Sequence, residues 1–379
     1  LIAKGTATEP IVFTSEEAVG SRKPGDWGGI ILCGKAKNNQ TEQQIEGGPR
    51  TKHGGADDAD NSGALSYVRI EFAGYPFQKD KEINGLTFGS VGSGTQIDHV
   101  QVSYSNDDSF EWFGGTVNCK YLVAYKGWDD DFDTDNGFSG KVQYGLSLRD
   151  SKIADTSQSN GFESDNCADG ATVDPRTKAT FSNITFVGPK VLDSKFQNTT
   201  DYITAGAYNP NNGSALGKFQ AAMQIRRSSN LNCINSVAIG WPIGLIIDGE
   251  KGNTVKDAKD KKFKLQNVYF AGMDAIGTDA NKKYEDYLYD AAKKQDIDKN
   301  QKSYSNTFFF SEPGNKYFDS WASLVGTDGY TPIAGSPLLG AASFAGWTGF
   351  DTVTYIGAFD GSNNWMSGWT NFDPQNAKY

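Results

Sequence analysis

The sequence predicts an all-β fold, a right-handed parallel β-helix in which successive turns of the chain, here called coils, stack into a solenoid. Three observations predict it: two strand-like phrases alternate along the chain, equivalent phrases recur at the spacing of one coil, and turn residues are abundant, with 44 glycines in 379 residues. Each coil of a solenoid buries its apolar face against the next, so a chain of this length can form one domain. We therefore expect a single domain over residues 1–379.

The first phrase is a run of alternating apolar residues, which is the period of a β-strand. Its copies lie at residues 65–74, 97–104, 119–125, 142–148, 181–188, 232–240 and 265–272. The second phrase is shorter, and its copies lie at residues 86–88, 110–112, 132–134, 162–164, 224–226 and 246–248. The tightest coils repeat about every 22 residues, as from Phe110 to Phe132. A β-sandwich would also have many short strands, but it would not keep every second strand in register.

Two segments between the phrases are predicted to leave the solenoid as insertions. Residues 189–219 are polar and contain glycine, so we expect a loop on the flank. In residues 274–303, Tyr284 and Leu288 begin an apolar stripe at helical spacing, and Asp279 could cap a helix. We therefore expect a helix in the second insertion.

Both ends of the chain differ from the repeating part. From about residue 312 to residue 379 the sequence is irregular and rich in aromatic residues, which predicts a cap over the last coil. The first residues resemble the middle of a coil, so we expect further N-terminal coils to precede Leu1.

Composition excludes several classes of function. The formal charge of −10 disfavours binding to nucleic acid, because phosphates would be repelled. No apolar run approaches the roughly 18 to 20 residues of a membrane-spanning helix. The four cysteines form no CxxC pair, and the chain has two histidines, so we expect buried thiols or one incidental disulfide rather than a metal site. These cysteines are Cys33, Cys119, Cys167 and Cys233.

Stacking turns the second phrase into a surface, because equivalent residues on neighbouring coils lie about 4.8 Å apart. The residues expected to point inward are Phe110, Phe132, Phe162 and Ile225. The expected outward column is Thr87, Glu111, Asp133, Glu163, Arg226 and Asp248, with Asp131 and Gln224 beside it. Asp108 and Asp130 precede the same strands at the turn. Carboxylates in line at this spacing repel one another and raise one another's pKa unless a cation or donor intervenes.

Three interpretations of the column remain open. The carboxylates could be solvated or hydrogen-bonded, as on many acidic protein faces. They could bind Ca²⁺, an ion that prefers oxygen ligands, and the densest source is Asp129, Asp130, Asp131, Asp133 and Asp135. They could also be catalytic, in which case the candidates are Glu111, Asp133, Glu163 and Arg226. Paired carboxyls suit a glycoside hydrolase, and an arginine beside Ca²⁺ suits a polysaccharide lyase, but neither histidine falls in the expected groove.

Several stretches resemble a known family. They are residues 1–15 and 25–32 at the start, and residues 107–115, 129–135 and 159–165 around the acidic phrases. They resemble exported β-helix proteins common in Bacteroidota, which are typically surface lipoproteins with a pectin-lyase-like solenoid. The resemblance covers nearly the whole chain. It implies an extracellular, cell-surface or outer-membrane location through a lipid anchor ahead of Leu1, and it supplies no catalytic residues.

The sequence as a whole favours a non-catalytic surface protein that binds an extracellular ligand, most plausibly a glycan, along the acidic groove. Trp128 and Trp241 are expected at turns, where their rings could stack on sugars, and Asp108, Asp131 and Asp248 could bind sugar hydroxyls. The first alternative is a Ca²⁺-dependent polysaccharide lyase or an acid glycoside hydrolase. The second is a structural subunit of an outer-membrane assembly.

Overall fold

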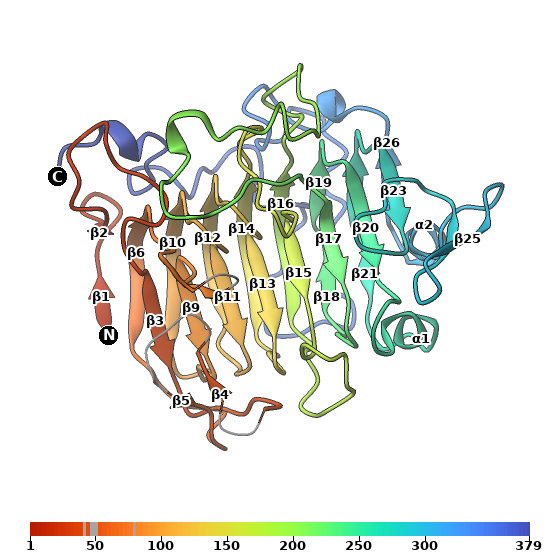
Figure 1. The fold of residues 1–379 in the computed structure, drawn as a ribbon, viewed down its shortest axis with the longest axis horizontal. Helices are drawn as coiled ribbons and strands as arrows, with labels where there is room; N and C mark the ends of the chain where they lie inside the picture. The colour runs from red at the N-terminus through yellow and green to blue at the C-terminus, as the bar shows by residue number, and fades with distance from the viewer. Residues whose placement is uncertain (41–42, 46–51, 79–80) are drawn as a thin grey trace.

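The computed structural model describes residues 1–40, 43–45, 52–78 and 81–379. These residues form a parallel β-helix in which the strands of two long sheets alternate along the chain (Figure 1). The larger sheet, sheet A, contains β1 (Ile2–Lys4), β2 (Ile11–Phe13), β6 (Ala64–Glu71), β10 (Gln96–Ser103), β12 (Cys119–Tyr125), β14 (Lys141–Leu148), β16 (Thr180–Val187), β18 (Asn232–Ile234), β19 (Val237–Ile239), β21 (Leu265–Gln266), β22 (Tyr269–Ala271) and β26 (Lys316–Phe318). Every copy of the first phrase falls in this sheet.

The smaller sheet, sheet B, carries every copy of the second phrase. It contains β3 (Ile30–Cys33), β9 (Leu86–Gly89), β11 (Phe110–Phe113), β13 (Phe132–Asp135), β15 (Phe162–Ser164), β17 (Ala221–Ile225), β20 (Ile243–Ile247) and β23 (Ala275–Thr278). Neighbouring strands within both sheets are parallel, as the register of each described pair shows. The predicted parallel β-helix is therefore confirmed.

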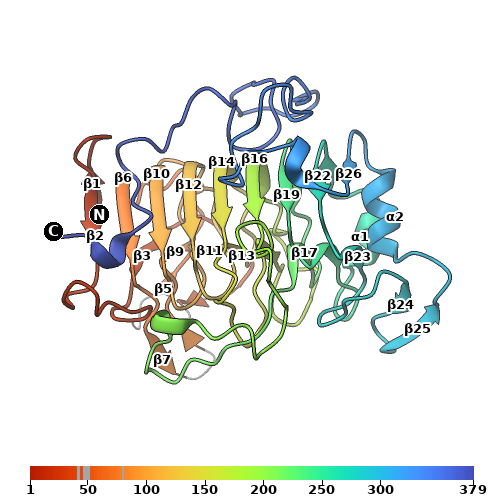
Figure 2. The ribbon, with the colours of Figure 1, turned by 90° about the horizontal axis from the view of Figure 1, so that it is seen from above.

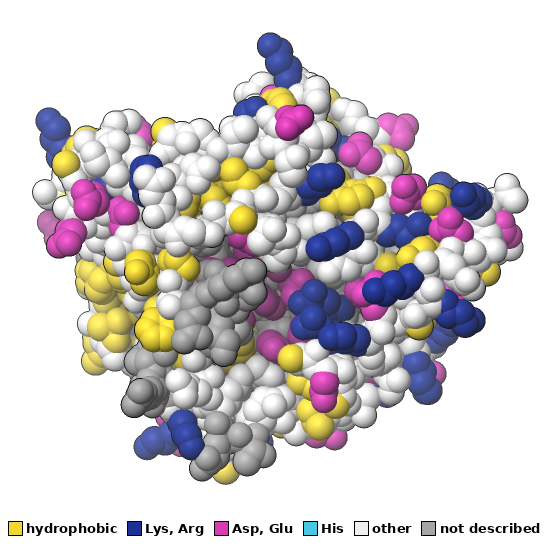
Figure 3. Space-filling model, viewed as in Figure 1, with side chains coloured by type: hydrophobic (Ala, Val, Ile, Leu, Met, Phe, Trp, Pro, Cys, Tyr) yellow, Lys and Arg dark blue, Asp and Glu magenta, His cyan; other side chains and the backbone are white. Residues whose placement is uncertain are grey.

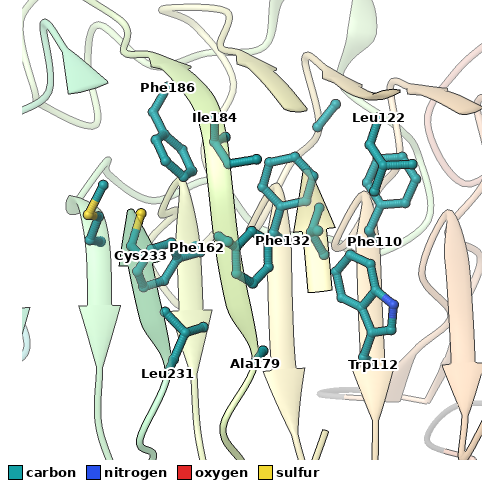
Figure 4. Close-up of a cluster of buried hydrophobic side chains, with 14 of the residues drawn as sticks. Phe110, Trp112, Leu122, Phe132, Phe162, Ala179, Ile184, Phe186, Leu231 and Cys233 are labelled. Atoms are coloured by element: carbon teal, nitrogen blue, oxygen red, sulfur yellow. The ribbon is translucent and has the colours of Figure 1, made fainter. Parts of the chain in front are cut away.

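The core lies between the two sheets and is built by the inward positions of both, and the phenylalanines of sheet B show how its residues stack. Phe110 pairs with Phe132, which pairs with Phe162, and all three are fully buried. The rings of Phe110 and Phe132 stack with their centroids 5.6 Å apart (Figure 4). Burying one such side chain contributes roughly 1.5 to 3 kcal/mol. Because strand side chains alternate, these phenylalanines fix their neighbours on the outer face.

The expected register fails by two residues between β15 and β17. Glu163 pairs with Gln224, and Phe162 packs against Met223 rather than Ile225. Gln224 therefore belongs to the outward column, whereas Arg226 and, on the next coil, Asp248 lie two residues further along the strand direction. The long insertion between these strands removes the constant spacing on which the expected alignment rested. Arg226 still points outward, because a two-residue shift preserves the alternation.

The expected helix in residues 274–303 is wrong, since this insertion forms β23 and the hairpin of β24 (Leu288–Asp290) and β25 (Gln295–Asp298). A helix does follow it, α2 (Tyr304–Ser311), and Asp279 caps that helix from a distance. Its carboxylate accepts hydrogen bonds from the backbone N–H groups of Tyr304 and Ser305, both at 2.9 Å. Asp279 therefore does cap a helix, but that helix is α2, which begins 25 residues further along the chain.

The expected C-terminal cap over the last coil also needs correction. The apolar end of the solenoid is covered by α2, whose Phe309 stacks on Phe270 with centroids 4.3 Å apart. Residues 324–379, which we call the strap, instead run back along the outer face of sheet A toward the first coil (Figure 2). Side-chain amides of sheet A hold it: Gln143 exchanges two hydrogen bonds with the backbone of Asp351, at 2.8 and 2.9 Å. The aromatic residues of this segment cover a flank rather than an end.

The remaining elements are short. They are the hairpins β4 (Gln43–Gln44) with β5 (Lys52–His53) and β7 (Pro76–Gln78) with β8 (Lys81–Glu82), the helix α1 (Thr254–Lys259), and three 3-10 turns at Gly206–Tyr208, Trp321–Ser323 and Pro374–Asn376. The flank loop of residues 189–219 has one of these turns as its regular structure. All four cysteines are free thiols. Within the described ranges, no helix has the length and apolar character needed to cross a membrane.

A carboxylate pocket on sheet B

A cavity of about 810 Å³ lies over the outer face of sheet B. Eight carboxylates and two arginines are among the residues that line it: Asp107, Asp108, Glu111, Asp129, Asp130, Asp133, Asp155, Glu163, Arg226 and Arg227. Figure 3 shows acidic side chains inside a hollow near the centre of this face, with basic side chains along one edge. We call this cavity the carboxylate pocket.

A motif repeated on two coils builds the floor of the pocket. Residues 107–111 read Asp-Asp-Ser-Phe-Glu and residues 129–133 read Asp-Asp-Asp-Phe-Asp, and the two phenylalanines pair in the core. Stacking in register therefore places Glu111 directly beside Asp133, and Asp133 beside Glu163 on the next coil. The Asn84 amide donates a hydrogen bond to the Glu111 carboxylate from the preceding turn.

The carboxylates form three overlapping triads, in each of which one oxygen per residue lies within 4.8 Å of the others. The triads are Asp107 with Asp108 and Asp129, Asp108 with Glu111 and Asp133, and Asp130 with Asp133 and Glu163. Asp108 and Asp133 each belong to two triads. The pocket thus presents a continuous row of oxygen donors rather than one isolated pair.

Hydrogen bonds orient part of this row and leave part of it open. The Asp108 carboxylate accepts a hydrogen bond from the backbone N–H of Asp130 at 2.8 Å. The Asp130 carboxylate accepts one in turn from the backbone N–H of Asn160 at 2.5 Å. By contrast, Oδ1 of Asp129 and Oδ1 of Asp133 are buried and have no hydrogen-bond partner. A buried oxygen without a partner is unfavourable, so these two atoms indicate that the protein alone does not satisfy the pocket.

Burial and mutual repulsion make these carboxyl groups weak acids. At Asp108, Asp129 and Asp133, burial raises the pKa well above its usual range and neighbouring carboxylates raise it further. Burial also raises the pKa of Asp130 to about 7, although the hydrogen bond from Asn160 opposes it. In the absence of a cation, the pocket therefore retains protons near neutral pH.

Two consecutive arginines close one side of the pocket. Asp165 accepts a hydrogen bond from Arg226 Nε at 2.8 Å and another from Arg227 Nη1 at 2.7 Å, while Arg226 Nη2 pairs with Glu163. Arg227 and Ser228 both have left-handed backbones, with φ of 47° and 68°, a conformation that costs energy for residues other than glycine. Burial would lower the pKa of Arg226, but the carboxylates of Asp165 and Glu163 outweigh it and raise the pKa. Arg226 therefore stays charged, which disfavours a role as a proton-accepting base.

Several residues expected at the site lie outside the pocket. Asp131 is fully buried and pairs with Arg149 Nη1 at 2.8 Å, so it is part of an internal ion pair. Asp135 and Asp248 do not line the cavity; the Asp248 carboxylate accepts a hydrogen bond from the backbone N–H of Glu250 at 2.7 Å. The expectation that Asp131 and Asp248 bind ligand through exposed carboxylates is corrected accordingly.

The expected aromatic platform is also absent from the pocket. Trp128 and Trp241 are both fully buried, Trp128 among apolar residues behind sheet A and Trp241 in the main core against Phe219. Their places beside turns suggested exposure. Trp128 is instead enclosed by an apolar cluster outside sheet A that includes Ala205 of the flank loop, and Trp241 packs inside the solenoid. None of the described residues that line the pocket is aromatic.

The structure adds residues that the sequence did not single out. Asp107 lies in the repeated motif, so its stacking position was a usable signal. Asp155 had no such signal, because it reaches the pocket through a bridge with Leu216 that holds the flank loop in place. At Gly217 a side chain would collide with the backbone, since an added Cβ would lie 1.9 Å from the carbonyl oxygen of Asp155. Through this contact the flank loop contributes residues 212–215 to the pocket wall.

The fold and the site define a class of protein: a parallel β-helix with a row of carboxylates in a pocket on the outer face of one sheet. The chain belongs to the family of pectate-lyase-like β-helix domains, whose sequence model matches residues 1–323. The match ends where the strap begins. No curated protein and no solved structure matches the chain significantly.

The pocket fits a calcium ion by its donor chemistry. Ca²⁺ takes six to eight oxygen ligands and accepts carboxylates in flexible arrangements. The three triads supply carboxylate oxygens alone, and two of these oxygens lack a partner within the protein. The ligands would come from Asp108 and Asp133, which are shared between triads, together with their neighbours Asp107, Glu111, Asp129, Asp130 and Glu163.

Proposed function

We propose that the protein binds an extracellular glycan in the carboxylate pocket, and that Ca²⁺ held by the pocket carboxylates takes part in binding. The observation that carries the proposal is the convergence of three overlapping carboxylate triads in one cavity of about 810 Å³. Eight acidic side chains against two arginines leave a large excess of negative charge there. A divalent cation offsets that charge and offers positions for sugar oxygens.

The residues divide this work between them. Asp108 and Asp133, each shared by two triads, hold the cation, and the backbone N–H of Asp130 fixes the orientation of the Asp108 carboxylate. Arg227 has a side chain 27% exposed and lines the cavity, so its guanidinium is placed to donate hydrogen bonds to a ligand. The cavity volume lies within the range of pockets that bind small molecules or segments of larger ones.

Calcium titration is the first test, with Ca²⁺ binding followed by calorimetry. The native protein is compared with Asp133→Asn and with the matched control Asp201→Asn, which removes an exposed carboxylate that does not line the pocket. We expect Asp133→Asn to weaken binding at least about ten-fold and the control to leave it unchanged. Because the carboxyls retain protons, binding should also release protons, which calorimetry in two buffers measures. If the native protein binds no Ca²⁺, the metal part of the proposal fails.

Glycan binding is tested separately on an array of extracellular polysaccharides, with Ca²⁺ present and then with a chelator. We expect specific glycans to be retained with Ca²⁺ and to be lost when it is removed. If a glycan binds equally well with the chelator present and in Asp133→Asn, its binding site lies elsewhere on the molecule.

A second candidate function is that of an acid glycoside hydrolase. It is favoured by Asp130, whose pKa is raised to about 7 beside the carboxyls of Asp133 and Glu163. A carboxyl that keeps its proton near neutral pH can act as a general acid, and a close second carboxylate can act as nucleophile or base. Release of new reducing ends from a bound polysaccharide, lost in Glu111→Gln and Asp133→Asn, would establish hydrolysis. A lyase would instead release unsaturated products, and Arg226→Ala would abolish them if this arginine took the proton.

The location follows from the same proposal. A glycan ligand and the family resemblance together favour an extracellular or outer-membrane protein, held at the cell surface by a lipid anchor. Protease accessibility on intact cells, with fractionation of the membranes, tests this. A role as a structural subunit of an outer-membrane assembly predicts that a partner co-purifies with the protein and that no glycan binds.

A further inference from the structure

The second feature that calls for an explanation is a column of left-handed residues on sheet A. On sheet A, equivalent positions of successive coils have positive φ, and these residues are Tyr67, His99, Tyr121, Tyr144, Asn183, Asn235 and Asn267, with φ between 48° and 64°. Asparagine visits this conformation readily, but bulky aromatic residues do so rarely. Strain of this kind persists where the surrounding structure requires it.

The two halves of the column meet the strap differently. The asparagines bond to it directly: Asn183 Nδ2 donates to the carbonyl of Tyr355 at 2.8 Å, and Asn235 Nδ2 donates to that of Ser343 at 3.1 Å. The aromatic residues meet the strap through rings, since Trp369 lies edge-on with its centroid 6.0 Å from that of Tyr67 and 5.7 Å from that of His99, and they stack on one another. Their ring centroids are 4.3 Å apart from Tyr67 to His99, 4.4 Å from His99 to Tyr121 and 4.8 Å from Tyr121 to Tyr144.

The strap covers the aromatic half only in part. A cavity of about 280 Å³ remains between them, which we call the strap pocket. It is lined by Tyr67, His99 and Tyr121 from sheet A and by Tyr355, Ala358, Asp360, Asn363 and Trp365 from the strap. Sheet A contributes ring edges to this pocket, because the ring faces are occupied by stacking.

The strap side of the pocket is held by internal hydrogen bonds and carries polar groups. The indole of Trp365 donates to the carbonyl of Ala358 at 2.9 Å and stacks on Phe359 with centroids 5.4 Å apart. Oδ1 of Asp360 accepts hydrogen bonds from the backbone N–H groups of Ser362 at 2.7 Å and Asn363 at 2.6 Å. Burial would raise the pKa of Asp360, but these hydrogen bonds outweigh it and lower the pKa, so the carboxylate is ionised.

From this geometry we infer that the strap pocket is a second binding site, and that it takes one neutral sugar ring. An ionised carboxylate accepts hydrogen bonds from sugar hydroxyls, and an amide such as that of Asn363 both donates and accepts. The ring edges of the walls add apolar surface that the C–H groups of a pyranose can cover. A sugar acid would be repelled by Asp360. Among the described residues, Asp360 belongs to no carboxylate triad, and the binding inferred here is binding without a metal.

The inference does not depend on the carboxylate pocket, which lies on the other sheet. The two sites would let one molecule hold a polysaccharide at two faces, so that each contact strengthens the other through effective concentration. The two sites also differ in their requirement for metal, and this difference separates them in one experiment.

The test is saturation-transfer NMR with a panel of neutral monosaccharides, in the presence of a chelator that removes Ca²⁺. We expect at least one sugar to bind saturably with a Kd on the order of 1 mM. Asp360→Asn keeps the oxygen that accepts the two backbone hydrogen bonds but removes the charge, and Tyr121→Phe keeps the ring stack but removes the hydroxyl. Each should weaken binding at least three-fold, on the order of the loss of one hydrogen bond, whereas Asp133→Asn in the carboxylate pocket should not change it.

Two results would overturn the inference. They are no saturable binding of any neutral sugar to the native protein, and binding that is unchanged in both Asp360→Asn and Tyr121→Phe. Circular dichroism and melting temperature of each variant establish that the strap remains folded. Failure here leaves the calcium titration untouched, and failure of that titration leaves this test untouched.

Discussion

The outer faces of sheet A and sheet B are both built by stacking equivalent residues of successive coils, but the stacked side chains attract one another on sheet A and repel one another on sheet B. On both faces, register stacks like residues upon like. On sheet A the stacked groups are aromatic rings and amides, which attract one another: Tyr67, His99 and Tyr121 stack, and Asn267 Nδ2 donates to Asn235 Oδ1 at 3.2 Å. On sheet B the stacked groups are carboxylates, which repel. The stacked side chains on the outer face of sheet A therefore stabilise one another. Those on the outer face of sheet B repel one another, and a bound cation would reduce this repulsion.

The largest expected effect comes from the core that the two faces share. Phe132→Ala removes a fully buried ring that packs against both Phe110 and Phe181. It should lower the free energy of unfolding by about 3 to 5 kcal/mol. Urea denaturation measures this, with Asp201→Asn as the surface control. A loss below about 1 kcal/mol would mean that the two faces do not depend on a common core.

Next in size is a substitution that should separate stability from binding on sheet B. Asp133→Asn removes a partly buried carboxylate flanked by Glu111 and Glu163. Without metal, the variant should be more stable than the native protein, because one repelling group is gone. It should nevertheless bind Ca²⁺ at least about ten-fold more weakly, or about 1.4 kcal/mol. Melting curves with and without Ca²⁺ measure both effects, and a destabilised metal-free variant would contradict the argument from repulsion.

The pH dependence should distinguish the two faces further. The folded-state pKa of Asp130 is raised from 3.8 to about 7. For an acid with a raised pKa, the folded state binds the proton more tightly than the unfolded state. Stability is therefore present below pH about 4 and is lost as pH rises through the folded pKa. The melting temperature of metal-free protein should fall between pH about 4 and 7, and saturating Ca²⁺ should reduce the fall.

The smallest expected effect concerns the contact between sheet A and the strap. Gln143→Ala removes two hydrogen bonds between sheet A and the backbone of Asp351 in the strap. The expected loss of stability is about 1 to 2 kcal/mol, with no change in Ca²⁺ affinity. Denaturation and calorimetry on the same preparation check both parts. Weakened Ca²⁺ binding in this variant would show that the two faces are coupled.

The sequence was sufficient to predict the features that repeat from coil to coil. Alternating phrases predicted both sheets, and the repeated acidic motif predicted the neighbours Glu111, Asp133 and Glu163. It was insufficient where the chain returns from a distance. The register of Arg226 depended on a long insertion, Asp155 reaches the pocket through a loop bridge, and the strap binds to amides such as Gln101 across 270 residues. Such contacts do not repeat along the sequence, so a search for repeated patterns cannot predict them.

Burial was the other quantity that the pattern could not supply. Trp128 and Asp131 sit at turns and in an acidic run, where exposure is the ordinary expectation. Their burial depends on partners elsewhere, since Asp131 pairs with Arg149 from the end of β14. The neighbouring coils determine whether a charged side chain contacts water or an opposite charge. This environment is therefore known only once the coils are stacked in the structure.

The path of the strap also has a consequence for how the chain acquires its fold. The hydroxyl of Tyr379 donates a hydrogen bond to Glu71 at 2.8 Å, and Gln375 accepts one from the backbone N–H of Arg22, so the strap covers the outer surface of coils that lie some three hundred residues earlier in the sequence. During synthesis the early coils can pair their strands at once, but their sheet A face stays uncovered until some three hundred residues later. Contacts so distant in sequence form slowly, and an open sheet face is prone to wrong partners in the meantime. Refolding should therefore be biphasic, with the solenoid forming first and the strap docking last.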